Sequence, residues 1–237
     1  MSTESHVAEN IKTVNEHIKA ICAECGRTEN PPRLVAVSKT KPISAVQEAY
    51  DIGQRHFGEN YVVELSEKSK ALESLADIKW HFIGHLQSNK AKIVCRTPNL
   101  FVIETIDTEK LAKIVNKEWI AHRGDAEKKL NVMIQVNTSG EEQKSGVSPD
   151  NVKALADVIA KECTGLNLMG LMTIGESGNG DHDFGELKRC RDEILGDPTL
   201  ELSMGRSADY DMAIRYGSTN VRVGSTIFGA RYYPPKN

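Results

Sequence analysis

The sequence predicts a (β/α)8 barrel, in which eight parallel strands form a closed ring covered by helices. Eight short apolar runs alternate with helical patterns along the chain, which is typical of parallel strands covered by helices. Eight such repeats within 237 residues also favour a closed barrel over an open doubly wound sheet, the alternative arrangement. We therefore expect one domain over residues 1–237, in which residues 1–30 form an extra N-terminal helix and its connector.

The first element is an amphipathic helix. Its apolar residues are spaced by 4, 3, 4 and 3 positions, which places them on one helical face: Val7, Ile11, Val14, Ile18 and Ile21. We expect this helix to end near Gly26, ahead of Pro31 and Pro32.

Eight strands and the helices between them follow. The predicted strands are Arg33–Ser38, Arg55–Gly58, Lys79–Gly84, Leu100–Glu104, Leu130–Val136, Leu166–Thr173, Leu200–Met204 and Val221–Gly224. The helical candidates are Ile43–Ile52, Tyr61–Leu75, Thr108–Ala121, Pro149–Cys163, Asp183–Leu195 and Ser207–Tyr216. A very short last helix is expected after Gly224.

Composition excludes several classes of protein. The net charge of −3 provides no positive field for a nucleic acid. No apolar run approaches the 18 or so residues that a membrane span needs, and the polar start of the chain does not resemble a signal peptide. Five cysteines, an odd number at scattered positions, argue against a disulfide framework and indicate a reducing compartment, so we expect a cytoplasmic protein.

Cys22 and Cys25 form a C-x-x-C in the last turn of the first helix, where we expect packing rather than redox or zinc chemistry.

Active groups of such barrels lie at the carboxyl ends of the strands, and Lys39 follows the first strand directly. At an apolar mouth, desolvation lowers the pKa of a lysine and frees its amine to attack a carbonyl. Small hydroxyl residues and glycines follow strands seven and eight, where barrels commonly bind phosphate: Ser203, Gly205, Ser207, Gly224, Ser225 and Thr226. A phosphorylated aldehyde could react with the Lys39 amine through its carbonyl and bind this predicted phosphate site through its phosphate.

Seven blocks of sequence, in order from about residue 33 to 231, resemble the pyridoxal phosphate homeostasis family, also called proline synthetase co-transcribed proteins. The blocks are Leu34–Pro42, Phe57–Tyr61, Lys79–Gln87, Val136–Gly140, Gly170–Gly175, Leu202–Asp209 and Val221–Gly229. The resemblance implies a barrel of the alanine racemase N-terminal domain type. It also implies a Schiff base between pyridoxal 5′-phosphate (PLP) and Lys39, whereas Lys41, next to Pro42, is expected to begin the next helix and to face solvent.

The resemblance implies further cofactor-binding residues. Asn60 is expected near the PLP ring and Arg222 against the pyridine nitrogen. Either Ser203 or Ser207 is expected to bind the phosphate together with the residues after the last strand, Gly224, Ser225 and Thr226. The chain departs from the family at Arg206, where a methionine is usual, so this guanidinium either contacts the phosphate or faces solvent.

The predicted function is a carrier or buffer of PLP, not an enzyme. An amino-acid racemase is the alternative, but racemases of this fold take one proton donor from a second domain, which we do not expect in a chain that ends at Asn237. An arginine at the ring nitrogen also keeps that nitrogen unprotonated and weakens the electron sink, which leaves at most weak racemase side activity. Recipients of PLP would be PLP-dependent apo-enzymes, and we expect a monomer, with no nucleic acid or membrane partner.

A third hypothesis, a phosphate-binding barrel isomerase without a cofactor, gives Lys39 no carboxylate of obvious catalytic spacing in the sequence. Glu59 and Glu104 lie near strand ends, where an exposed carboxylate usually compensates a helix dipole. His81 and His85 are four residues apart, but their run is a strand and a loop, so we expect packing and loop roles rather than metal binding. We expect the two tryptophans, Trp80 and Trp119, in the core.

Overall fold

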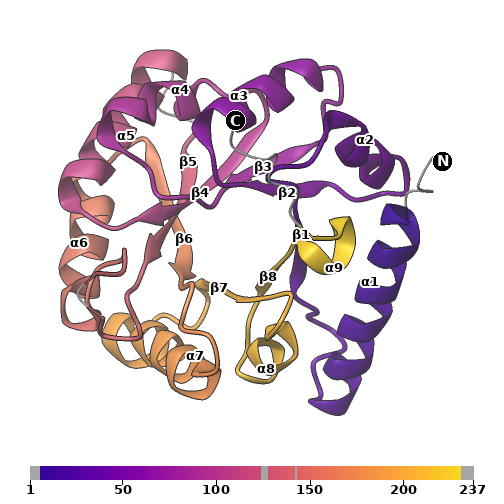
Figure 1. The fold of residues 1–237 in the computed structure, drawn as a ribbon. Coiled ribbons are helices and arrows are strands. Elements are labelled where there is room, and N and C mark those ends of the chain that lie inside the picture. Colours follow the sequence, from indigo (N-terminus) through magenta and orange to yellow (C-terminus); the bar gives the residue numbers. More distant parts are fainter. Residues whose placement is uncertain (1–5, 124–127, 142, 231–237) are drawn as a thin grey trace.

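Eight parallel strands close into a barrel in the computed structural model of the chain, which describes residues 6–123, 128–141 and 143–230. Each strand pairs with the next in chain order, and the last pairs with the first to close the ring (Figure 1). The strands are β1 (Arg33–Val37), β2 (His56–Glu59), β3 (Lys79–Phe82), β4 (Leu100–Ile106), β5 (Leu130–Gln135), β6 (Leu166–Met172), β7 (Glu201–Arg206) and β8 (Asn220–Val223). The predicted fold class is confirmed, and all eight predicted strands form.

Helices surround this ring, as Figure 1 shows. They are α1 (Val7–Glu24), α2 (Ile43–Asp51), α3 (Val62–Ala71), α4 (Ala91–Cys95), α5 (Glu109–Arg123), α6 (Val152–Glu162), α7 (Gly180–Arg189), α8 (Tyr210–Arg215) and α9 (Ser225–Phe228). Two short 3-10 turns, Ser88–Lys90 and Pro149–Asn151, precede α4 and α6, and a π-helical segment, Cys190–Leu195, continues α7. The sequence reading missed α4, because five residues are too few to show a helical period.

The N-terminal helix α1 packs on the outside of the barrel beside α8 and α9 (Figure 1). The Asn10 side chain donates to the Ile227 carbonyl at 2.9 Å, and Arg27 donates to the carbonyls of Ile214 and Ser218 at 2.7 and 2.8 Å. The predicted helix is confirmed from Val7 onward, while residues 1–5 of the predicted N-terminal segment lie outside the described residues. All five cysteines are free thiols.

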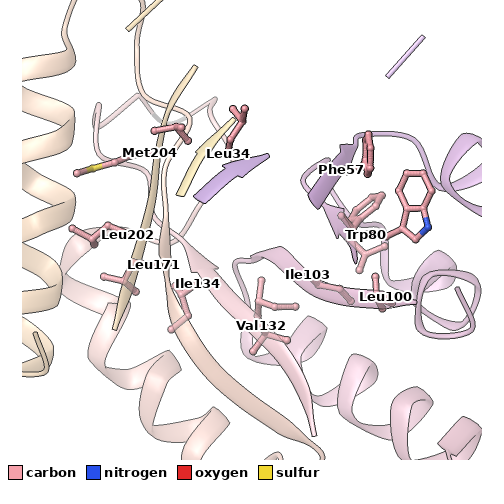
Figure 2. Close-up of a cluster of buried hydrophobic side chains, with 14 of the residues drawn as sticks. Leu34, Phe57, Trp80, Leu100, Ile103, Val132, Ile134, Leu171, Leu202 and Met204 are labelled. Atoms are coloured by element: carbon pink, nitrogen blue, oxygen red, sulfur yellow. The ribbon is translucent and has the colours of Figure 1, made fainter. Parts of the chain in front are cut away.

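Apolar side chains of the strands and helices form the core between the two layers. Figure 2 shows part of this cluster, which includes Leu34, Phe57, Trp80, Ile103, Val132, Leu171, Leu202 and Met204. Trp119 belongs to the same core, and its ring nitrogen donates to the Lys128 carbonyl at 2.7 Å. Both tryptophans are therefore core residues, as predicted.

Polar side chains fill much of the barrel interior. Because successive strand residues point to opposite faces, the neighbours of the apolar core residues point inward. Glu104 on β4 meets Ser203 on β7 at 2.5 Å. Since β4 and β7 are not neighbours in the ring, this hydrogen bond crosses the interior of the barrel. Part of the interior is thus a buried polar network, beside a small apolar cluster of Val102, Met133 and Met172.

Candidate functional site

A cavity of about 370 Å³ opens at the carboxyl ends of the strands, within the size range of small-ligand sites. Six of the eight residues predicted to bind a cofactor line it: Lys39, Asn60, Ser207, Arg222, Gly224 and Ser225. Apolar walls come from four further residues, Val37, Ile83, Met172 and Ile174. The structure thus brings together residues from β1, β6 and β8 and from the loops that follow β1, β2 and β7.

Lys39 follows β1 and lies in a turn over Ser38–Lys41, which the Lys41 N–H closes by donating to the Ser38 carbonyl at 3.0 Å. The helix α2 begins only at Ile43, so Lys41 lies in this turn, and the prediction that Lys41 begins the helix is wrong. Its ammonium donates to the Ala230 carbonyl at 2.7 Å, at the rim of the cavity.

Asn60 follows β2, and its amide oxygen is buried without a hydrogen-bond partner among the described residues. Gly84 lies directly against the backbone of this residue and has no room for a side chain, since a Cβ at Gly84 would lie 1.9 Å from the Asn60 carbonyl oxygen. A buried polar atom without a partner is costly. An acceptor held in this way beside a cavity is therefore available to a ligand donor.

The part of the cavity that follows β7 and β8 has the features of an anion site. The Gly224 N–H donates to the Ser207 hydroxyl at 3.1 Å, which joins the loop after β7 to the end of β8. The first N–H groups of α9, those of Ser225 and Thr226, have no acceptor within the helix. Thr226, which was also predicted to bind the cofactor, is not among the residues that line the cavity.

Ser203 lies inside the barrel rather than at the cavity. It is fully buried, donates to Glu104 Oε2 at 2.5 Å and accepts from Arg222 Nη1 at 2.6 Å and from Asn220 Nδ2 at 2.9 Å. The sequence reading placed Ser203 past the end of strand seven, but β7 continues to Arg206. Of the two candidate serines, Ser207 is the one that lines the cavity.

Arg222 forms the floor of the cavity. Its Nη2 donates to the Thr173 carbonyl at 2.8 Å, so both ends of the guanidinium are fixed. Burial lowers the pKa of Arg222, and the nearby Glu104 carboxylate opposes this shift. Burial alone would raise the pKa of Glu104, but the hydrogen bond from His81, with Arg222 and Ser203 nearby, holds it below its usual value. The carboxylate and the guanidinium thus form a buried pair bridged by Ser203.

Arg206 lies at the edge of the cavity, with its guanidinium 3.5 Å from the Asp209 carboxylate. The side chain is about one third exposed. Asp209 also accepts the backbone N–H of Arg206 at 2.6 Å. The departure from the family pattern therefore adds a cation that is already paired to an acid three residues further along the chain.

Two carboxylates that the sequence suggested as helix-dipole partners have different roles. Both Glu59 and Glu104 are fully buried, so their reading as exposed groups is wrong. Glu59 accepts from Lys68 and Ser38 at 2.7 and 2.6 Å. Lys68 was not singled out from the sequence, although its position four residues after Glu64 on the same helix was a readable signal for an ion pair.

The histidines of β3 and its loop have the packing and loop roles that were expected. His81 is fully buried, its Nδ1 is bonded to Glu104 at 2.6 Å and its Nε2 to His56 at 2.8 Å, whereas His85 is exposed in the loop. In the described ranges, no three His, Cys, Asp or Glu side chains are arranged to hold a metal ion. Over the same ranges, every helix is too short or too polar to span a bilayer.

Comparison with known proteins assigns this architecture. A family model described as the N-terminal domain of alanine racemase matches residues 5–232. The human pyridoxal phosphate homeostasis protein is 47% identical over 251 residues, which cover 100% of this chain and 90% of that protein. PipY of Synechococcus elongatus, solved with PLP bound, has a TM-score of 0.77 at 29% identity and covers 94% of this chain and 100% of its own. Alanine racemase of Corynebacterium glutamicum shares the fold, with a TM-score of 0.67 at 14% identity over 94% of this chain and 61% of that one.

The fold and the cavity at the strand ends define a barrel of the alanine racemase N-terminal domain class. Within this class, the chain belongs to the pyridoxal phosphate homeostasis protein family.

Proposed function

We propose that the protein binds PLP through a Schiff base at Lys39 and acts in PLP homeostasis as a carrier or buffer, not as a dedicated enzyme. One observation carries this proposal. A single cavity brings together Lys39, the anion-type group at Ser207, Gly224 and Ser225, and Arg222 between them. PLP has an aldehyde for Lys39, a phosphate for the anion-type group and a ring nitrogen for Arg222.

The residues present fit this cofactor. The unpartnered amide oxygen of Asn60 can accept from a hydroxyl on the PLP ring, and the backbone N–H groups of Ser225 and Thr226 can donate to its phosphate. Arg222 can donate to the ring nitrogen, as the family resemblance implies. We assign the phosphate contact after β7 to Ser207, because Ser203 is already bonded to Glu104 and Arg222.

When bound, PLP supplies an aldehyde that takes up the Lys39 amine with loss of water. The side chain of Arg222 stays charged and donates hydrogen bonds only, so the ring nitrogen that faces it stays unprotonated. An unprotonated ring is a weak electron sink, which disfavours the carbanion chemistry that a racemase needs. This arrangement favours binding and release of the cofactor over racemisation.

Absorbance of the purified protein tests the proposal. We expect a visible band after addition of PLP, loss of that band with borohydride, and the reduced cofactor mass on the peptide that contains Lys39. We expect Lys39→Ala to lose the band and the tight retention of PLP. If the variant kept both, the Schiff base at Lys39 would be refuted. Racemase assays on alanine and serine separate the carrier from the racemase.

Three further features belong to this proposal. We expect a monomer in the cytoplasm that passes PLP to PLP-dependent apo-enzymes, in a single domain that spans residues 1–237. The near-neutral net charge of −3 supports a small-molecule carrier over a nucleic-acid partner. Size-exclusion chromatography with light scattering tests the oligomeric state. Reactivation of an apo-enzyme by the loaded protein, compared with the same concentration of free PLP, tests the transfer.

A further inference from the structure

The residue that follows Lys39 adopts a backbone conformation that needs support. Thr40 has φ of +64°, in the left-handed region that a β-branched residue seldom adopts. Its hydroxyl is buried without a hydrogen-bond partner among the described residues. Such a conformation persists only where the surrounding structure holds it. The turn that carries Lys39 is therefore held from outside.

The support comes from three charged side chains of β2 and α3. The ammonium of Lys68 donates to the Ser38 carbonyl at 2.7 Å, and to the carboxylates of Glu59 and Glu64 at 2.7 and 2.6 Å. The Ser38 hydroxyl donates to Glu59 at 2.6 Å. This ion cluster thus holds the residue before Lys39 through both its backbone and its side chain.

The same cluster holds the residue after Lys39. Oε1 of Glu64 accepts the backbone N–H of Thr40 at 2.6 Å, and the same oxygen accepts from Lys68. A hydrogen bond to a charged acceptor is stronger than one between neutral groups. The backbone on both sides of Lys39 is therefore tied to one buried ammonium and its two carboxylates.

Packing of the fold alone does not account for this cluster. The side chains of Lys68 and Glu59 are 5% and 0% exposed, and burial of such charges costs desolvation that ion pairing often only offsets. Apolar residues of similar size would pack α3 against the barrel equally well. The three hydrogen bonds of the cluster to the backbone and hydroxyl of residues 38 and 40 are specific to the turn.

We propose that Glu64 and Lys68 are positioning residues for the Lys39 amine: they hold the Ser38–Lys41 turn in the conformation that directs this amine to the aldehyde in the cavity. The inference rests on the proposed function. Neither residue lines the cavity, so neither touches the cofactor and both act through the backbone. Misplacement of a reacting group by about 1 Å can cost on the order of 100-fold.

Glu64→Ala is the variant that tests the proposal, because Glu64 is the most exposed member of the cluster, at 22%. Two ligands are compared by titration: PLP, and pyridoxine 5′-phosphate, which has an alcohol in place of the aldehyde and forms no bond to an amine. We expect the dissociation constant for PLP to rise at least tenfold, while that for pyridoxine 5′-phosphate changes less than twofold. The rate at which borohydride traps PLP on the protein should fall in parallel.

Conservative and control variants complete the test. Glu64→Gln keeps an acceptor for the Thr40 N–H, so it should recover most of the PLP affinity. Glu67→Ala removes the same charge from an exposed position on α3 and should change neither affinity. Lys68→Met should behave as Glu64→Ala does, with the exposed Lys70→Met as its control. Thermal unfolding of each ligand-free variant shows that it is folded.

The outcomes are distinct. An equal loss of affinity for both ligands would show that the cluster supports the cavity as a whole, and it would overturn the positioning role. Unchanged PLP affinity in Glu64→Ala would overturn it as well. If borohydride trapped no adduct in the parent protein, the Schiff base itself would be refuted, and the positioning role with it. If the parent formed the adduct and Glu64→Ala formed it at the same rate, only the positioning role would be refuted.

Discussion

The hydroxyl of Ser203 accepts a hydrogen bond from Arg222 Nη1 at 2.6 Å and donates one to Glu104 Oε2 at 2.5 Å. All three side chains are buried, and the serine joins a cation to an anion across the barrel. The orientation of Arg222 at the floor of the cavity therefore depends on a residue of β4 that does not line the cavity itself.

We predict that Ser203→Ala destabilises the ligand-free protein. The substitution leaves Nη1 of Arg222 and Oε2 of Glu104 without their shared partner, and an unsatisfied buried group of this kind costs about 1–3 kcal/mol. Urea denaturation measures the free energy of unfolding. The matched control is Ser44→Ala, at an exposed position in α2, which should change stability by less than about 0.5 kcal/mol. Unchanged stability combined with weaker PLP binding would instead make Ser203 a phosphate ligand.

We predict that Ser207→Ala weakens PLP binding and leaves the stability of the ligand-free protein largely unchanged. Its hydroxyl lines the cavity and is held by the Gly224 N–H at 3.1 Å, so the alanine removes a contact at the proposed phosphate position. Loss of about 1.4 kcal/mol corresponds to tenfold weaker binding. We expect the dissociation constant for PLP to rise about tenfold, while the affinity for pyridoxal, which lacks the phosphate, stays the same. A similar loss for both ligands would place Ser207 away from the phosphate.

Most of the fold could be predicted from the sequence, because strands and helices leave local patterns. The eight apolar runs and the helical spacing that begins at Val7 depend on neighbours within a few positions. The short helix Ala91–Cys95 left no such pattern. Lys39 and Gly224 could be located at the site because the carboxyl ends of barrel strands meet at one face.

The interior of the site could not be predicted in this way. Glu104 and Ser203 are 99 positions apart, and no local pattern shows that they meet. Glu59 and Lys68 form a buried pair, although glutamate and lysine side chains usually face solvent. The sequence places Ser203 at the end of strand seven, but no local pattern shows that β7 continues to Arg206 or that the Ser203 side chain meets Glu104 inside the barrel.

Arg206→Met is predicted to change the dissociation constant for PLP less than tenfold. The Arg206 guanidinium lies 3.5 Å from the Asp209 carboxylate and is partly exposed, and exposed pairs and charges of this kind contribute about 0–1 kcal/mol. Equilibrium titration of both proteins at low and at moderate salt measures the change. A loss above tenfold that grows at low salt would show that Arg206 contacts the phosphate directly.

His56 gives the protein a pH dependence that can be tested on the ligand-free chain. Burial, followed by His81 and the charges of Arg33 and Lys79, lowers the pKa of His56 from 6.5 to about 2. Between these values the unfolded chain binds a proton that the folded chain does not, so the free energy of unfolding falls as the pH drops below 6.5. The slope for one histidine is at most about 1.4 kcal/mol per pH unit, and partial exposure of His56 reduces it.

His56→Gln should therefore lose stability less steeply than the parent between pH 6.5 and 4.5, as measured by urea denaturation at each pH. Burial raises the pKa of Glu59 to about 7, against the opposing effect of Lys68, and this contributes stability that is lost as the pH rises from 4.5 to 7. Its effect on the slope is opposite in sign and common to both proteins, so it cancels in the comparison. His6→Gln, at an exposed residue ahead of α1, is the control and should keep the slope of the parent. Equal slopes for the parent and His56→Gln would show that His56 is protonated inside the barrel, because only a histidine that takes up its proton equally in both states leaves the slope unchanged.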